Sequence, residues 1–240
     1  MAKLLKIAHN GNSVPKKQEL NSNQMKVSIY KNIKDTTSSQ TINLSELVAS
    51  IRQGNVVQLG QNIASLVQQI KSTQSKKERD KLKCSLPNVT VSGVFKKRSK
   101  QGLLNYSGLI QVDFDNLLLE RLPKLREALE NDPYTLTCFI SPSGKGLKLI
   151  VKVLPNKERH LDSFLGLEKY YLDKYSLTLD TKCKDIGRTM YLSYDPEVFV
   201  NWDSQVFVPP LETTQKQVKE TDPKPKKITA SIPSNIESEL

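Results

Sequence analysis

The chain has 240 residues, of which 37% are hydrophobic and 25% charged, and its formal net charge is +11. This length and composition support a globular core, as one large domain or as a domain with an accessory lobe, and they exclude a chain too polar to fold. So large a positive charge favours a polyanionic partner.

Cysteines and hydropathy exclude further classes. Cys84, Cys138 and Cys183 are widely spaced and form no CxxC or His/Cys cluster, which indicates neither a disulfide framework nor a zinc site. No stretch is apolar enough to span a membrane, and residues 1–20 do not have the pattern of a signal peptide. We therefore expect a cytoplasmic protein.

The elements of the N-terminal part are short. Residues 1–24 are polar and predict a loose arm, and alternation over 25–30 predicts a strand. Asn43 and Glu46 have the spacing of a capping box and open a short helix. Two more helices are expected at 63–70 and 76–83, followed by a strand at 89–95. Residues 25–100 are therefore predicted to form a helical accessory lobe.

Residues 101–208 are predicted to form the core of the domain, which would carry any catalytic site. Its elements are expected in the order strand 108–115, helix 118–129, strands 134–141 and 147–153, helix 157–175 and strand 188–194. This β-α-β-β-α-β succession predicts an α+β fold with an RRM-like or ferredoxin-like antiparallel sheet, in which the first and third strands are central. Residues 209–240 are rich in Pro, Lys, Thr and Ser and predict a disordered linker that tethers a further domain.

Basic residues gather just before this core. The segment 71–100 holds ten Lys and Arg against two acidic residues, whereas the tail from Leu211 is neutral. Such a run predicts either a solvated face or a surface that contacts nucleic acid.

The first candidate site is the Asp113-Phe114-Asp115 sequence at the end of the strand 108–115. Because alternate side chains share a face of a strand, the two carboxylates are expected to project side by side. Paired carboxylates repel each other, and hard oxygen ligands of this kind suit Mg²⁺ or Mn²⁺. The alternative is that one Asp caps the following helix and the other is solvated.

The second candidate site is Ser141-Pro-Ser-Gly-Lys-Gly-Leu-Lys148, which joins two predicted strands. Its glycines allow backbone N–H groups to turn toward an anion, and Ser141, Ser143, Lys145 and Lys148 supply donors and charge. Lys148 and Lys152 share one strand face, which predicts an open, phosphate-facing surface. The alternative is an ordinary hairpin loop with glycines for its turn geometry.

The third candidate site runs from Asp180, at the end of a short apolar piece, to Arg188 at the start of a strand. A guanidinium in this position can contact a triphosphate through two parallel hydrogen bonds. The alternative is a loop Asp that caps a turn and an Arg at a sheet edge.

Together these segments resemble a known family. Leu86-Pro-Asn-Val-Thr, Ser92-Gly-Val-Phe, Ser107-Gly-Leu-Ile-Gln-Val-Asp-Phe-Asp115, Ser141-Pro-Ser-Gly-Lys-Gly-Leu-Lys148 and Leu192-Ser-Tyr-Asp-Pro196 are similar to the VirE N-terminal or BT-type primase-like domains. These are related to archaeo-eukaryotic-type primases and primase-polymerases. They often precede helicases in mobile-element and phage proteins.

The resemblance implies a role for each matching residue. Asp113, Asp115 and Asp180 would ligate two Mg²⁺ or Mn²⁺ ions and form the catalytic set, with Asp185 as the alternative third acid. Ser141, Ser143, Lys145, Lys148 and Arg188 would bind the nucleoside triphosphate. A basic stretch of Lys96, Lys97, Arg98 and Lys100 would hold a single-stranded DNA template by its backbone.

One position departs from the primase pattern, because the second motif usually has His where this chain has Lys148. Two functions therefore remain open. The first is a primase or primase-polymerase that makes nucleic acid on a single-stranded template. The second is an inactive nucleic-acid-binding module on the same fold that serves a helicase partner.

Overall fold

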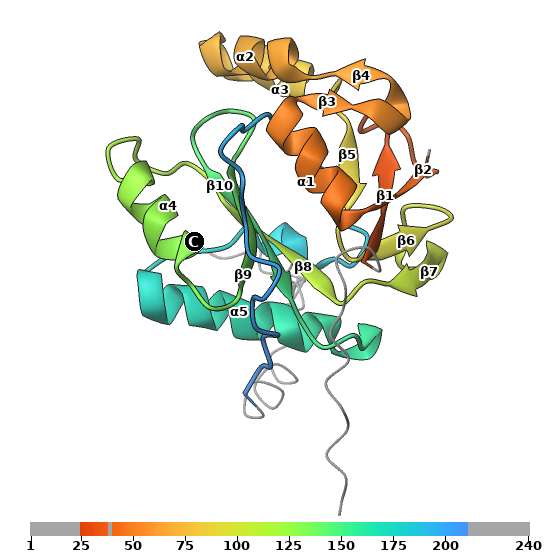
Figure 1. Cartoon of the computed structure of the whole chain (residues 1–240), viewed down its shortest axis with the longest axis vertical. Coiled ribbons are helices and arrows are strands. Elements are labelled where there is room, and N and C mark those ends of the chain that lie inside the picture. Colours follow the sequence, from red (N-terminus) through yellow and green to blue (C-terminus); the bar gives the residue numbers. More distant parts are fainter. Residues whose placement is uncertain (1–24, 38–39, 211–240) are drawn as a thin grey trace, which may run out of the picture.

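The computed structural model describes residues 25–37 and 40–210, which form a mixed α+β structure (Figure 1). In the described residues there are five α-helices and four antiparallel sheets, two with four strands and two with two strands. The α+β class is thus confirmed. The predicted arm at 1–24 and most of the predicted linker lie outside the described residues.

The N-terminal part contains a sheet and is not the helical lobe that the sequence predicted. Its strand order is β11-β5-β1-β2, with bounds Met190–Tyr191, Asn88–Thr90, Lys26–Tyr30 and Gln40–Asn43. Three helices accompany it, α1 (Leu44–Gln53), α2 (Ala64–Ser72) and α3 (Lys76–Lys83). These helices were predicted correctly, and the Asn43 N–H donates to Glu46 Oε2 at 2.7 Å at the start of α1. The sequence analysis did not predict this sheet, because β5 and β11 are far along the chain from β1 and β2 and their pairing leaves no local sequence pattern.

Two hairpins complete this part, β3–β4 (Asn55–Val56 and Gln61–Asn62) and β6–β7 (Gly93–Phe95 and Leu103–Tyr106). The strand predicted at 89–95 is divided into β5 and β6. Gly93 has φ 154°, and a Cβ at this position would overlap the carbonyl oxygen of Asn105. Only glycine therefore allows β6 to approach β7 so closely.

The second four-stranded sheet has the order β12-β9-β10-β8, with bounds Phe199–Val200, Thr135–Ile140, Leu147–Lys152 and Leu109–Phe114. Helix α4 (Leu122–Glu130) follows β8, and α5 (His160–Tyr175) follows β10. Four short 3₁₀ helices lie in the connections, η1 (Val57–Leu59), η2 (Lys100–Gly102), η3 (Lys157–Arg159) and η4 (Thr181–Lys184).

The predicted ferredoxin-like plan is not completed. The first five elements follow it, but the strand expected at 188–194 is β11, which pairs with β5 in the other sheet through Met190↔Val89 and Tyr191↔Asn88. β12 takes the place beside β9 instead, and β8 is an edge strand rather than a central one. The departure begins after α5, where η4 passes the end of β8 and leads the chain to the first sheet.

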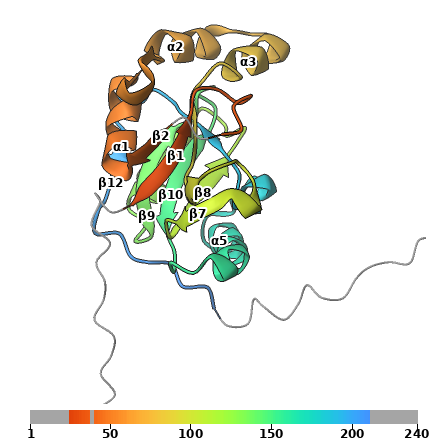
Figure 2. The same cartoon turned by 90° about the vertical axis from the view of Figure 1, so that its right-hand side faces the viewer.

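The two large sheets share a hydrophobic core. Leu109, Leu136, Phe139 and Ile150 from the second sheet join the buried residues of β1, α1 and α2 in one cluster. The opposite face of the second sheet packs against α4 and α5, and Figure 2 shows α5 beside this sheet. Figures 1 and 2 place α2 and α3 at one end of the molecule and α5 at the other. Among the described residues no helix is both long and apolar enough to cross a bilayer.

Candidate active site

The pairing of β8 with β10 sets the first contact of the site. Asp113 and Lys148 are direct partners across the two strands. Lys148 Nζ donates to Asp113 Oδ2 at 2.5 Å, and the two side chains are only 9% and 11% exposed. The first and second predicted motifs are therefore joined by a buried ion pair.

The electrostatic environment keeps Lys148 charged. Burial acts to lower the pKa of Lys148, but the carboxylates of Asp113 and Asp115 outweigh it, and the pKa is raised above its usual value. The second carboxylate oxygen of Asp113, Oδ1, is buried and has no hydrogen-bond partner among the described residues. One oxygen of this carboxylate is thus paired with an ammonium, and the other is buried without a partner in the described part of the chain.

The face that carries Lys148 is not the open surface that the sequence predicted. Lys148 and Lys152 are each 7% exposed. Lys152 Nζ donates to the carbonyl oxygens of Trp202 at 2.5 Å and Ser204 at 3.2 Å. Because the first sheet covers this face, the buried ammonium groups must find partners inside the protein.

The third predicted segment lies against the first. The backbone N–H of Asp180 donates to the carbonyl oxygen of Asp113 at 3.1 Å. Asp180 caps η4 by accepting from the N–H of Lys182 at 3.0 Å, and its other oxygen lies 3.5 Å from Nη2 of Arg188. Asp180 therefore caps a turn, which is the alternative role that the sequence analysis gave it. Its contact with Arg188 also brings Arg188 toward the end of β8.

Asp115 lies just beyond β8 and is exposed. Asn116 follows it with φ 57°, a left-handed conformation that Asn tolerates and that turns the chain away from the sheet. In the part of the chain that the structure describes, no group of three or more His, Cys, Asp and Glu side chains is placed to hold a metal ion. The metal site that the resemblance implies therefore stays a prediction, with Asp113 and Asp115 as the two acids at the end of β8.

The hairpin loop between β9 and β10 lies beside the end of β8. The Ser141 and Ser143 hydroxyl oxygens are 3.1 Å apart. The carbonyl oxygen of Lys145 accepts from the N–H of Leu117, and the side chain of Lys145 is exposed. A Cβ at Gly146 would overlap the carbonyl oxygen of Phe114. Glycine at this position therefore lets the loop approach the strand that carries the acids.

Sequence reasoning missed two contributions to the site. A Cβ at Gly144 would lie 3.5 Å from Cγ of Lys71, so the last turn of α2 adds a lysine beside the hairpin loop. Gln111 Nε2 donates to Cys183 Sγ at 3.3 Å, which fastens η4 to β8. Burial, followed by the charge of Asp113, raises the pKa of the Cys183 thiol to about 12. The presence of Gln111 near the site could have been predicted from the sequence, because it lies two residues from Asp113 and shares its face of the strand.

The predicted nucleic-acid-binding residues divide into two kinds. Lys96, Lys97 and Lys100 are exposed in the connection from β6 to β7. Arg98 instead donates to the Ile33 carbonyl at 2.9 Å and lies 5.8 Å from the ring centre of Tyr30. We therefore assign Arg98 a structural role, and the three lysines remain candidates for contact with a phosphate backbone.

Asp195, in the last quoted motif, joins the second sheet to helices α1 and α4. Its Oδ2 accepts from the N–H of Ile140 at 2.8 Å and from Nη1 of Arg126 at 3.2 Å. Its own N–H donates to the Ile51 carbonyl at 3.1 Å. This motif thus contributes to the fold rather than to the candidate site.

Comparisons with known proteins gave one match. Neither the curated proteins nor the solved structures contain a match to this chain. The family described as BT4734-like, N-terminal domain, matches residues 81–199, a span that holds all three predicted motifs. Over residues 81–199, just under half of the chain, the protein is therefore similar to the BT4734-like N-terminal domain family.

Proposed function

We propose that this protein is a primase-type domain that binds a nucleoside triphosphate and a single-stranded DNA template and transfers nucleotides to a growing strand. One observation carries the proposal. Three segments far apart in sequence meet at the end of β8, through the Lys148–Asp113 ion pair and the Asp180–Asp113 backbone hydrogen bond. These are the segments whose residues resemble the three primase motifs.

The charges at this meeting point suit a triphosphate. Lys148 is held charged beside Asp113, and Arg188 is 42% exposed beside Asp180. Lys145 in the hairpin loop and Lys71 beside it are both exposed. We infer that Arg188, Lys145 and Lys71 contact phosphate oxygens and that Lys148 orients Asp113, because its ammonium is already engaged.

We propose that a divalent cation, Mg²⁺ or Mn²⁺, enters together with the nucleotide. Asp113 Oδ1 is buried without a partner, and Asp115 lies two residues away on the exposed side. These oxygens are hard donors of the kind that both ions prefer. Asp180 is occupied by its cap hydrogen bond and by Arg188, which makes it the weakest member of the predicted set.

The template is expected along the exposed lysines of the β6–β7 connection. A Cβ at Gly187 would lie 3.7 Å from Cα of Ser99, so this connection lies directly beside the segment from Asp180 to Arg188. Lys96, Lys97 and Lys100 would contact phosphates without reading bases. Binding would therefore depend on salt more than on sequence.

Primer extension tests the proposal. The protein would be incubated with single-stranded DNA, labelled nucleotides and Mg²⁺ or Mn²⁺, with and without a primer. An Asp113→Asn/Asp115→Asn variant is the control. We expect labelled product that the double substitution abolishes, and product in the lane without primer would establish priming. Product of equal amount from both proteins would contradict the assignment of these acids.

The Lys148–Asp113 ion pair also favours a second candidate function. A carboxylate already neutralised by a buried ammonium binds cations less readily, as expected for a module that has lost catalysis. Such a module would bind single-stranded DNA for a helicase partner in a mobile-element or phage replication protein. Salt-sensitive DNA binding with no product in either metal would favour this function.

A further inference from the structure

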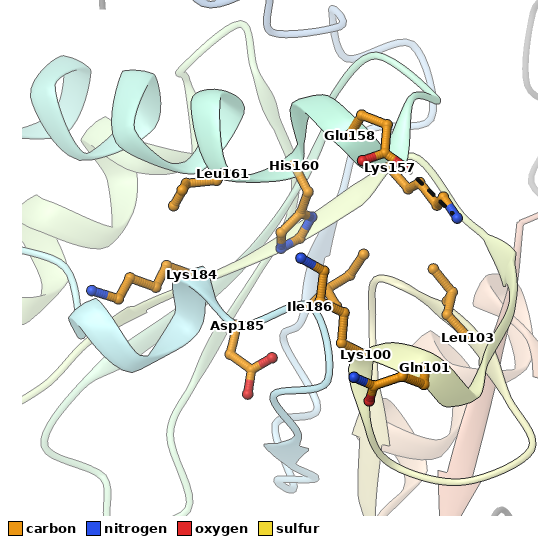
Figure 3. A pocket seen from close by; sticks show the side chains of 10 residues that line it. All are labelled: Lys100, Gln101, Leu103, Lys157, Glu158, His160, Leu161, Lys184, Asp185 and Ile186. Carbon is orange, nitrogen blue, oxygen red and sulfur yellow. Dashed lines mark ion pairs between the residues drawn. The ribbon is translucent and has the colours of Figure 1, made fainter. Parts of the chain in front are cut away.

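A pocket lies apart from the candidate active site, at the opposite end of η4 from Asp180 (Figure 3). Its volume is about 770 Å³, within the usual range for small-molecule sites. The walls come from three places in the fold, the η2 turn, the η3–α5 junction and the residues that follow η4.

Lysines from three separate elements border this pocket. Lys100 comes from η2, Lys157 from η3 and Lys184 from η4. The Lys157 ammonium lies 3.7 Å from Glu158. The ammonium groups of Lys100 and Lys184 make no hydrogen bond or ion pair with any part of the chain that the structure describes. Two uncompensated cations therefore border one cavity, which favours an anionic ligand.

His160 provides an independent indication. It lines the pocket but is only 5% exposed, its Nδ1 lies 2.9 Å from the Tyr106 hydroxyl, and its Nε2 has no partner among the described residues. Burial lowers the pKa of this imidazole to about 4, although the charge of Asp185 opposes the shift. A buried polar atom without a partner is costly in a folded protein, and a ligand can supply the missing hydrogen bond.

The remaining walls resemble those of a nucleotide site. Leu103, Leu161 and Ile186 provide apolar surface against which a planar ring can lie. Asp185 Oδ1 accepts from the N–H of Gly187 at 3.0 Å, and Oδ2 makes no hydrogen bond or ion pair within the described part of the chain. This second oxygen can therefore accept from a hydroxyl or amino group. In Figure 3 the Lys100 ammonium lies just below the His160 ring, and the Asp185 carboxylate points away from that ring.

We propose that this pocket binds a mononucleotide, with its phosphates at Lys100 and Lys184 and its base against Leu103, Leu161 and Ile186. This site is separate from the acids at the end of β8, although it shares Lys100 with the proposed template path. The inference therefore goes beyond the proposed function and does not depend on it. The phosphates themselves can belong to a free nucleotide or to a DNA strand, and the experiment separates these sources.

Calorimetric titration with ATP, adenosine, inorganic phosphate and a single-stranded oligonucleotide tests this proposal. Four proteins are compared: the unchanged chain, Lys100→Ala/Lys184→Ala, Asp113→Asn, and the control Lys76→Ala/Lys77→Ala. The control removes two exposed lysines from α3, so it matches the charge lost from the pocket. We expect an ATP site that is kept in Asp113→Asn and in the control, and that binds at least tenfold more weakly in the pocket variant alone.

A spectroscopic measurement places the ligand. In the Asp113→Asn protein, addition of ATP should shift the NMR signal of the His160 imidazole. No binding of ATP, or binding lost in Asp113→Asn but kept in the pocket variant, would overturn the proposal. An oligonucleotide that displaces ATP from the pocket would overturn the assignment to a mononucleotide and indicate strand phosphates. Absence of primer extension with intact ATP binding would instead contradict only the proposed function.

Discussion

Lys148 and Asp113 face each other from neighbouring strands, with Nζ 2.5 Å from Oδ2 and both side chains almost fully buried. This pair fixes the charge at the centre of the candidate site, because it gives one carboxylate a permanent counterion. It also makes Lys148 important for stability as well as for any chemistry.

Replacing Lys148 with Met should destabilise the protein by about 3 kcal/mol, because an unpaired carboxylate would remain buried. Chemical denaturation of the unchanged protein and the variant measures this loss. The double variant Lys148→Met/Asp113→Asn should recover part of it, since neither residue then carries a charge. A double variant no more stable than Lys148→Met would show that the ion pair is not the source of the effect.

Gly146→Ala should disturb the contact between the hairpin loop and β8. A Cβ at this position would overlap the Phe114 carbonyl oxygen, so the strand that carries Asp113 must shift. We expect reduced nucleotide binding together with lower thermal stability. Gly60→Ala is the control, because its φ of 61° costs about 1 kcal/mol but no atom lies within 4 Å. Equal nucleotide binding by both variants would argue against a role for the loop.

Burial of His160 should make stability fall in mild acid. The pKa of His160 is lowered to about 4 from an ordinary value of 6.5, so the neutral form is favoured in the folded state. The contribution of neutral His160 to the free energy of unfolding is fully present above pH 6.5. It is lost as the pH falls through 4, and the total loss is about 3 kcal/mol.

Urea unfolding between pH 7 and 4 measures this loss. His160→Phe removes the titrating group, so its stability should fall less steeply across the same range. Parallel curves for the two proteins would assign the acid sensitivity to other groups.

The exposed lysines of the β6–β7 connection should govern the salt dependence of DNA binding. Lys96→Ala/Lys97→Ala/Lys100→Ala should reduce the slope of log K against log salt by about 2. Fluorescence anisotropy with a labelled single strand at several salt concentrations gives this slope. Arg98→Ala should instead lower stability, because Arg98 bonds the Ile33 carbonyl, and should leave the slope nearly unchanged. A reduced slope for Arg98→Ala together with an unchanged slope for the triple variant would indicate that DNA binds near Arg98 instead.

Local patterns in the sequence determined most of the elements and the order in which they follow. Apolar periodicity located α2, a charged segment before Pro87 located α3, and apolar or alternating runs located β8 and β10. The Asn43–Glu46 spacing located the start of α1. The neighbouring positions of Asp113 and Lys148 were also predictable. The strands β9 and β10 are joined by a hairpin loop and therefore pair with each other. In the predicted β-α-β-β-α-β order, the first strand, β8, is expected to pair with the other edge of β10.

Strand partners and burial were decided only by the tertiary structure. Met190–Tyr191 forms a strand as predicted, but its partner is β5 in the other sheet, and no local pattern specifies a partner so far away. Lys148 and Lys152 are buried because that sheet covers their face. The pocket around His160 arises in the same way. Its three lysines come from separate turns, and only the folding of the chain brings their side chains around one cavity.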